Sequence, residues 1–210
     1  MVAVEYLQEK IISKAYKPGD FISEADVASE LKISRGPVRK ALLTLESEGL
    51  AEIHANGRTI VLGLSQKYLT DMYDLRMMLE KEAVLRIIEQ DFTDFSPLLA
   101  TFKKMLEISE ENKSANEISE ANKKLLVELD YTFHSHLMSL SENRALYNAW
   151  KTVNPLMRTL MLQNIDLISI EIKRHKIIMD SLMRKEKECI DILQEHLIGA
   201  KNKLLKIFYG

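Results

Sequence analysis

Three histidines and an aspartate in the second part of the chain have the chemistry of metal ligands, and their spacing decides which of them could meet. Asp130 and His134 are four positions apart, so on one helix they share a face and could reach a single ion. His136 lies about 200° around the helix from that face and points away, as a packed or surface histidine. Taken singly, each of these histidines is more often an ordinary half-buried residue than a ligand.

His175 and His196 must lie on two different helices if both are to reach the same ion. They are 21 residues apart, which on one continuous helix is about 32 Å. The polar residues 184–188 are where the chain could reverse and bring the two imidazoles together. One carboxylate and three imidazoles from three helices suit a divalent metal ion, with Zn²⁺ the first choice and Ni²⁺, Mn²⁺ or Fe²⁺ as alternatives, and leave positions open for water or another ligand.

A second group of chemically active residues is basic and lies near the N-terminus. Residues 31–45 contain four basic side chains and no acidic one, a local charge of +4 in a chain of net charge −2. On a helix over this segment the apolar residues share one face, and the opposite, free face carries Arg35, Gly36, Arg39 and Lys40. Such arginines can donate to phosphates or guanine edges, and Gly36 lets the backbone come close to DNA. The alternative is a solvated basic face.

The elements around this basic segment predict a helix-turn-helix. A first helix must stop before the turn at residues 17–20. Ser23 is a suitable N-cap for a second helix, and Ser34 for a third, with Pro37 tolerated in its first turn. Gly49 is positioned as the left-handed terminator of that third helix. Two short helices joined by about three residues make a helix-turn-helix.

A β-hairpin is predicted directly after these helices. The β-compatible runs 51–54 and 59–62 flank Asn56 and Gly57, the strongest short hairpin signal. A helix-turn-helix followed by a hairpin is a winged helix. Its wing tip would place Gly57, Arg58 and His54 near the minor groove or the phosphates.

The glycines divide the chain near residue 64, because five of the seven lie before it. Beyond that point apolar residues recur at three- and four-residue spacing, interrupted mainly at Pro97 and Pro155. The predicted fold is mostly α: a winged helix-turn-helix domain over residues 1–63, then an all-α helical bundle over residues 64–210. The bundle is expected to hold about five to seven helices, with breaks near residues 90–91, 112–116, 141–142, 163–169 and 184–188.

Composition excludes several classes of protein. A single cysteine rules out an internal disulfide and a thiolate zinc cluster. No apolar run approaches the roughly 18 residues of a membrane span, and the start of the chain lacks a secretory pattern, so we expect a cytoplasmic protein without a membrane segment. The net charge of −2 alone argues against nucleic-acid binding, but the acid-free segment 31–45 reverses that inference.

The N-terminal residues resemble the winged-helix domain of the GntR family of bacterial transcription regulators. The resemblance covers nearly all of residues 2–63 and rests on Pro18, Gly19 and Asp20, on Ser23 and Glu24, and on residues 34–42 and 45–50. It implies that Arg35 and Arg39 contact DNA, that Gly36 lies against the DNA backbone and that Gly57 belongs to the wing tip. Gly36 and Lys40 stand where the family usually has Thr and Glu, and the order Gly57, Arg58 is also unusual. The operator sequence therefore cannot be taken from relatives.

The helical part resembles the FCD-type effector domain of one branch of the same family. The resemblance rests on residues 130–134, on Arg174 and His175 and on residues 195–197, and it implies ligand roles for Asp130, His134, His175 and His196. Residues 71–80 resemble the first helix of that domain. Arg76 on this helix could direct positive charge toward a carboxylate-bearing effector, or it could simply pair with Glu80 one turn on.

We therefore expect the protein to be a DNA-binding transcription regulator that acts as a repressor, and not an enzyme. It would bind a double-stranded operator as a homodimer, and a small carboxylate effector at the metal site would modulate its affinity. One rival is a metal-dependent hydrolase or oxygenase that uses the Asp/His₃ set. Another is a regulator whose metal is purely structural.

Overall fold

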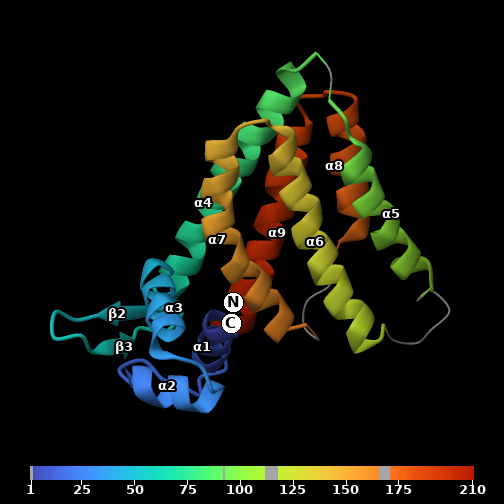
Figure 1. Cartoon of the computed structure of the whole chain (residues 1–210). Helices are drawn as coiled ribbons and strands as arrows, with labels where there is room; N and C mark the ends of the chain where they lie inside the picture. Colours follow the sequence, from blue (N-terminus) through green and yellow to red (C-terminus); the bar gives the residue numbers. More distant parts are fainter. Residues whose placement is uncertain (1, 92, 112–117, 166–170) are drawn as a thin grey trace. The chain divides into compact units, whose positions relative to one another are not determined.

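The computed structural model describes residues 2–91, 93–111, 118–165 and 171–210 (Figure 1). Its contacts divide the chain into two compact units, Met1–Leu69 and Thr70–Gly210. Helices dominate these ranges and a small three-stranded sheet accompanies them, which confirms the predicted mostly α class. Within the same ranges, none of the helices combines the length and apolar character that a membrane span requires.

The first unit contains the elements predicted for a winged helix. In chain order they are α1 (Val2–Ile12), β1 (Phe21–Ile22), α2 (Glu24–Leu31), α3 (Arg35–Ser47), β2 (Ala51–Ile53) and β3 (Thr59–Val61). Three residues separate α2 from α3, as expected for a helix-turn-helix. The next helix, α4 (Gln66–Glu89), begins in this unit and continues into the second.

Local signals place the ends of α2 and α3. The backbone N–H of Asp26 donates to Ser23 Oγ at 3.3 Å, so Ser23 caps α2 as predicted. Ser34 has the extended backbone of an N-cap before α3, although its side chain makes no capping bond. Gly49 follows α3 with φ at +64°, a conformation in which a side chain is strained. The predicted terminator is therefore confirmed.

The wing is an antiparallel hairpin. In the β2–β3 pair Ala51 lies opposite Val61 and Ile53 opposite Thr59. Gly57 in the connecting turn has φ at +79°, which a hairpin turn of this kind requires. Strand β1 adds to the other edge of β3, giving the order β1-β3-β2. It was not predicted, because two residues are too few to form a periodic pattern.

The core of the first unit is built on the apolar face of α3. Val38, Ala41, Leu42 and Leu45 are each at most 1% exposed, which confirms the predicted separation of the helix into two faces. A buried polar pair lies at the edge of this core, where Gln8 Nε2 donates to both oxygens of Glu48, at 2.9 and 2.8 Å. Burial raises the pKa of Glu48, and the hydrogen bonds from Gln8 partly oppose this shift.

The second unit consists of helices in the part of the chain that the structure describes. After α4 come α5 (Ser96–Glu111), α6 (Glu120–Leu140), α7 (Arg144–Gln163), α8 (Ile172–Met183) and α9 (Cys189–Tyr209). The predicted breaks at 90–91, 141–142 and 184–188 all fall between helices. The one at 112–116 lies outside the described residues. The predicted break at 163–169 is only partly within the described residues, and there it agrees with the structure, because α7 ends at Gln163.

Pro155 does not break the helical segment, contrary to expectation. It lies inside α7, which continues on both sides of it. A proline within a helix removes one backbone hydrogen bond and costs about 3 kcal/mol. Here both flanks are anchored in the core, because Trp150, Val153, Leu156 and Leu160 are each at most 4% exposed. Burial of these side chains, worth roughly 1.5–3 kcal/mol each, outweighs the loss.

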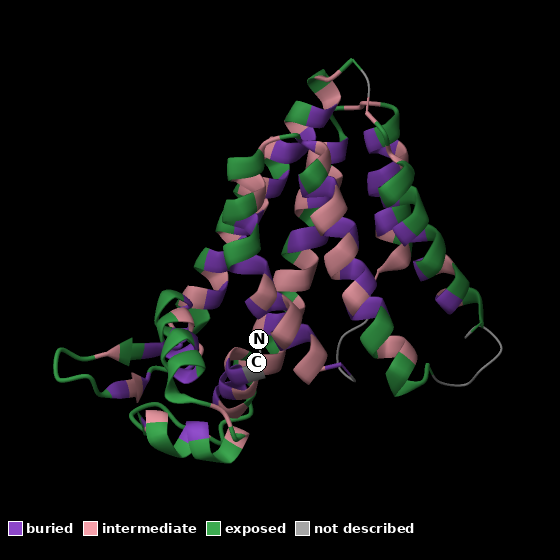
Figure 2. Cartoon of the chain, in the orientation of Figure 1, coloured by how far each residue is buried: buried purple, intermediate pink, exposed green. Residues whose placement is uncertain are grey.

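The core of the second unit lies between its helices. Figure 2 shows the buried residues of α6, α7 and α9 on their mutually facing sides. Helix α6 packs against both α5 and α7, and α8 packs against both α5 and α9. Trp150, Phe133 and Leu98 are completely buried in this core. Helix α6 is therefore held on both sides, which positions the polar residues that it carries.

Candidate functional site

The four predicted metal ligands converge from three helices of the second unit. Asp130 and His134 lie one turn apart on α6, His175 lies on α8, and His196 lies on α9. Each offers one ligand atom, and these atoms all lie within 4.8 Å of one another. All four residues are buried, His134 and His175 completely. Such a cluster could hold a metal ion.

Two short contacts bring the ligand atoms together. His134 Nε2 is 3.3 Å from His196 Nε2. His175 Nε2 is 2.9 Å from Asp130 Oδ1, and no hydrogen bond is assigned to this nitrogen among the described residues. Leaving a buried polar atom unsatisfied costs about 1–3 kcal/mol. A cation shared by the four ligand atoms would satisfy it, so the donor set fits a metal ion.

Outer hydrogen bonds orient two of the imidazoles. His134 Nδ1 lies 2.7 Å from Glu80 Oε2, and His175 Nδ1 lies 3.0 Å from the backbone oxygen of Glu171. Because a carboxylate and a carbonyl only accept, the network assigns the proton of each ring to Nδ1. The lone pair of each Nε2 is then free to face the cluster. Metal-binding histidines commonly have this second hydrogen bond.

Two of the four residues, Asp130 and His196, have pKa values lowered from their ordinary values. Burial lowers the pKa of His196 well below 6.5, and the nearby His175 and His134 lower it further. Burial raises the pKa of Asp130, but the close approach of His175 and the electrostatic influence of His134 and His196 outweigh burial and lower that pKa overall. A neutral imidazole and an ionised carboxylate both offer lone pairs.

Glu80 on α4 is a site residue that sequence reasoning did not identify as such. It is completely buried, and besides the bond from His134 it accepts Arg76 Nε at 2.6 Å and Trp150 Nε1 at 2.9 Å, both on Oε1. Burial raises the pKa of Glu80, but Arg76 and His134 outweigh it and hold that pKa at about 2. The i, i+4 spacing to Arg76 was the only sequence signal. It pointed to an ion pair rather than to the histidines.

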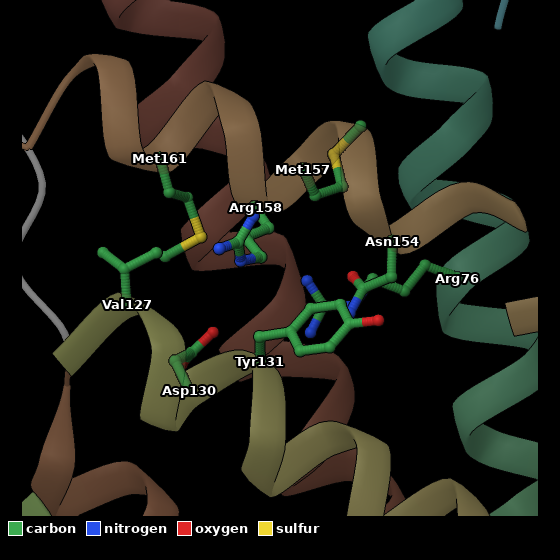
Figure 3. A pocket seen from close by; sticks show the side chains of 8 residues that line it. All are labelled: Arg76, Val127, Asp130, Tyr131, Asn154, Met157, Arg158 and Met161. Carbon is green, nitrogen blue, oxygen red and sulfur yellow. The ribbon is translucent and has the colours of Figure 1, made fainter. Parts of the chain in front are cut away.

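Arg76 makes the ion pair with Glu80 and also lines a cavity beside the cluster (Figure 3). The cavity has about 180 Å³ of empty volume, including space open to solvent. In Figure 3, Arg76 extends from α4 toward the space between α6 and α7. The other lining residues are Val127, Asp130 and Tyr131 of α6 and Asn154, Met157, Arg158 and Met161 of α7. Asp130 thus belongs both to the ligand cluster and to the cavity wall.

His136 lies outside the cluster, as predicted from its angular position. Its Nδ1 is 3.0 Å from Thr101 Oγ1 of α5, and the residue is half-buried.

The residues predicted to contact DNA are exposed on and just before α3. Ser34, Arg35, Gly36, Arg39 and Lys40 all belong to this exposed set. Arg39 is held by two hydrogen bonds to a carboxylate of the preceding helix: its Nε donates to Glu24 Oε1 at 3.0 Å and its Nη2 to Oε2 at 3.1 Å. The side chain of Arg39 nevertheless stays 71% exposed. Sequence reasoning did not foresee the pairing with Glu24.

The wing carries the remaining predicted DNA contacts. Gly57 and Arg58 are both exposed in the hairpin. The guanidinium carbon of Arg58 lies 5.1 Å from the centre of the Phe21 ring of β1, a cation–π arrangement. Strand β1 therefore supplies a surface that orients the arginine at the wing.

Comparisons with known proteins agree with this architecture. The family model described as bacterial regulatory proteins, gntR family, matches residues 2–61, and the model of the FCD domain matches residues 71–198. The Nta operon transcriptional regulator of Aminobacter aminovorans is 30% identical over 200 residues, which cover 95% of this chain and 91% of that protein. The gluconate operon transcriptional repressor of Bacillus subtilis is 28% identical over 162 residues, or 77% of this chain and 63% of that repressor.

A solved structure has the same fold. The structure of Escherichia coli McbR, also called YncC, superposes with a TM-score of 0.68 at 20% identity, covering 99% of this chain and 97% of the other. Regulators of this kind bind DNA operators and typically act as dimers, and these relatives are regulators rather than enzymes. The chain belongs to the GntR family of bacterial transcription regulators, with an FCD domain after its winged helix.

Proposed function

We propose that this regulator reads its operator with α3 and the wing, as a homodimer, and that its Asp/His₃ cluster binds a divalent metal ion that takes part in sensing a small carboxylate. In this proposal residues 1–63 form the DNA-binding domain and residues 64–210 the metal- and effector-binding domain. An effector that prefers one arrangement of the dimer would change the spacing of the two α3 helices. It could alter operator affinity by no more than its differential binding free energy.

The DNA-reading role is supported by the two faces of α3. Its apolar residues are buried, which leaves Ser34, Arg35, Gly36, Arg39 and Lys40 exposed together. Residues 31–45 carry a charge of +4 and contain no acidic residue, and Glu24 of α2 pairs with one of the four cations, Arg39. Arg35 and Arg39 are the residues that we expect to contact base edges or phosphates, with Lys40 contributing to the phosphate contacts. Gly57 and Arg58 would extend the interface at the wing.

The metal-binding role is supported by one observation above all: four buried ligand atoms lie within 4.8 Å of one another, and one of them, His175 Nε2, has no hydrogen-bond partner among the described residues. Three imidazoles and one carboxylate favour Zn²⁺, and the same donor set accepts Ni²⁺, Mn²⁺ or Fe²⁺. Asp130, His134, His175 and His196 are the proposed ligands.

The effector is proposed to occupy the cavity that Asp130 shares with the cluster. Arg76 lines this cavity and has guanidinium donors beyond the Nε that bonds Glu80. A small carboxylate could therefore bind the metal with one oxygen and Arg76 with the other. The Bacillus subtilis relative is named for a gluconate operon, and gluconate is a carboxylate of the chemical class that we propose.

The DNA-reading role is tested by Arg35→Ala and Arg39→Ala in the full-length protein. The DNA is a duplex selected by wild-type protein from a random-sequence pool, and binding is measured by fluorescence anisotropy at several fixed salt concentrations. Loss of a base-contacting arginine costs about 1–3 kcal/mol, so each variant should bind roughly 5- to 150-fold more weakly.

A matched control removes the same charge elsewhere. Lys103→Ala lies on α5, where the lysine side chain is 78% exposed, and it should bind DNA like wild type. Metal content, measured on the same preparations by elemental analysis, should be equal in all four proteins. If both arginine variants bound DNA like wild type, α3 would not be the recognition helix.

A further inference from the structure

Glu80 is a buried carboxylate with partners from three helices. Its own helix, α4, contributes Arg76 at 2.6 Å from Oε1, and α7 contributes Trp150 Nε1 at 2.9 Å from the same oxygen. Helix α6 contributes His134, whose Nδ1 is 2.7 Å from the other oxygen. Glu80 has no exposed surface and Arg76 is 3% exposed. A fully buried carboxylate is rare and must be well paired.

Stability alone does not explain this arrangement. A buried ion pair such as Arg76 with Glu80 often contributes little net stability, because desolvation offsets the attraction. Satisfying Arg76 also does not require a histidine on the other oxygen. The use of both oxygens, one for Arg76 and Trp150 and one for His134, instead joins the cavity wall, helix α7 and the metal cluster through one side chain.

The bond to Glu80 controls the orientation of His134. Because Nδ1 is held by the carboxylate, Nε2 of the same ring points to the cluster, where it lies 3.3 Å from His196 Nε2. A charged acceptor also makes the imidazole a stronger donor to a metal ion than a neutral acceptor does. His175 has only a backbone carbonyl, that of Glu171, in the corresponding position. His134 is thus the ligand that a carboxylate orients.

We propose that Glu80 is a positioning residue of the metal site, holding His134 in its ligand orientation and transmitting metal occupancy to Trp150 on α7. This inference rests on the proposed metal-binding function and adds a route by which occupancy is felt outside the cluster. A metal ion on His134 Nε2 strengthens the bond from Nδ1 to Glu80. The share of the negative charge of Glu80 that is available to its hydrogen bonds with Trp150 and Arg76 then changes. The metal site and the cavity that Arg76 lines are coupled in this way, and the coupling is reciprocal.

The chain supplies its own probe for this coupling. Trp150 is the only tryptophan in the sequence, and its indole N–H donates directly to Glu80. Its fluorescence therefore reports on the hydrogen bond in question. Co²⁺ is a suitable test metal, because its visible absorption depends on the number and geometry of its ligands.

The experiment compares Glu80→Gln with wild type in the full chain after removal of bound metal. Co²⁺ affinity is measured by chelator competition with Co²⁺ absorption recorded during the titration. Trp150 emission is recorded in a parallel titration with Zn²⁺, because Co²⁺ itself quenches nearby tryptophan whereas d¹⁰ Zn²⁺ does not. Loss of such an outer hydrogen bond costs roughly 10- to 100-fold in metal affinity. We expect that loss, an altered Co²⁺ spectrum at saturation, and a smaller change in Trp150 emission for each ion bound.

The matched control is Glu82→Gln, two positions along the same helix. Glu82 pairs with Arg86 at 2.8 Å and its side chain is 45% exposed, so this variant should bind Co²⁺ like wild type with the full emission change. Glu80→Asp keeps the charge but shortens the side chain by one methylene group. It should weaken Co²⁺ binding as Glu80→Gln does. If Glu80→Gln loses its helical circular dichroism, Glu80→Asp is the variant that tests the role of Glu80.

The outcomes separate this inference from the proposed function. If a folded Glu80 variant bound Co²⁺ with wild-type affinity and emission change, while His175→Ala did not bind, the role of Glu80 would be refuted and the metal site would stand. If wild type itself bound no Co²⁺, Zn²⁺, Ni²⁺, Mn²⁺ or Fe²⁺, the metal-binding function would be refuted and the inference with it.

Discussion

Metal binding should stabilise the second unit, and His175→Ala should abolish most of that effect. The proposed ligands lie on α6, α8 and α9, and their assembly depends on the folded bundle, because His175 and His196 are 21 residues apart in the sequence. A metal ion that binds only the folded state raises its stability by a mass-action term. The change in melting temperature with added metal therefore measures the site.

The size of the effect follows from that term. At a free metal concentration of 100 Kd the folded state gains about 2.7 kcal/mol. For a unit of this size each kcal/mol raises Tm by roughly 3 °C, so we expect a shift of about 8 °C. If loss of one of four ligands weakens binding about 100-fold, the same metal concentration equals Kd and the gain falls to about 0.4 kcal/mol. That corresponds to roughly 1 °C.

The assay is differential scanning fluorimetry of metal-free protein with a buffered series of Zn²⁺ concentrations. The metal-induced shift is compared, rather than Tm itself, because His175→Ala also leaves a cavity. His136→Ala is the matched control: it removes an imidazole from α6 that bonds Thr101 outside the cluster, so it should keep the full shift. An equal shift in wild type and His175→Ala, or none in wild type at saturating metal, would refute the reasoning.

Two further predictions concern the stability of the first unit. Burial raises the pKa of Glu48, so the folded state holds this proton to higher pH than the unfolded state, and the contribution of Glu48 to stability falls as pH rises above about 4.5. Glu48→Gln removes this loss, while Gln8 can still donate to the new amide oxygen. The advantage of this variant over wild type in urea midpoint should therefore grow as pH rises above about 4.5, and an advantage that stays constant with pH would contradict the shift. Gly49→Ala should destabilise α3 by roughly 1–3 kcal/mol, because φ is +64° and the new Cβ would lie 2.9 Å from Tyr68 Cε2. Hydrogen exchange of α3 amides measures this loss, and Gly36→Ala, which meets no atom within 4 Å, should show little of it.

Features that depend on a few neighbouring residues could be predicted from the sequence. Ser23 caps α2 because its hydroxyl reaches the N–H of Asp26, three residues away. Gly49 and Gly57 adopt positive φ where the helix end and the hairpin turn require it. The two faces of α3 follow from the helical repeat alone. All of these features depend on residues within a few positions of one another. They can therefore be recognised from the spacing of residue types in the sequence.

The Asp/His₃ cluster was predictable in its members but not in its geometry. The shared face of Asp130 and His134 follows from helical spacing, whereas their approach to His175 and His196 depends on how α6, α8 and α9 pack. The family resemblance, rather than periodicity, supplied the complete set. Pro155 shows where local rules fail. The rule that proline breaks a helix predicted an interruption there, but burial of the side chains on both sides of Pro155 keeps α7 continuous.

The sequence by itself determined the two-part organisation, the winged helix, the basic face of α3 and the types of residue that could hold a metal ion. Only the tertiary structure decided that Glu80 accepts from His134, which is 54 positions away, that Glu24 holds Arg39, and that Arg76 faces a cavity as well as its ion partner. The physical reason is the range of the interactions. Caps, turns and amphipathic faces arise from covalent neighbours, while hydrogen bonds between helices depend on which side chains the packed core brings within 3 Å of one another.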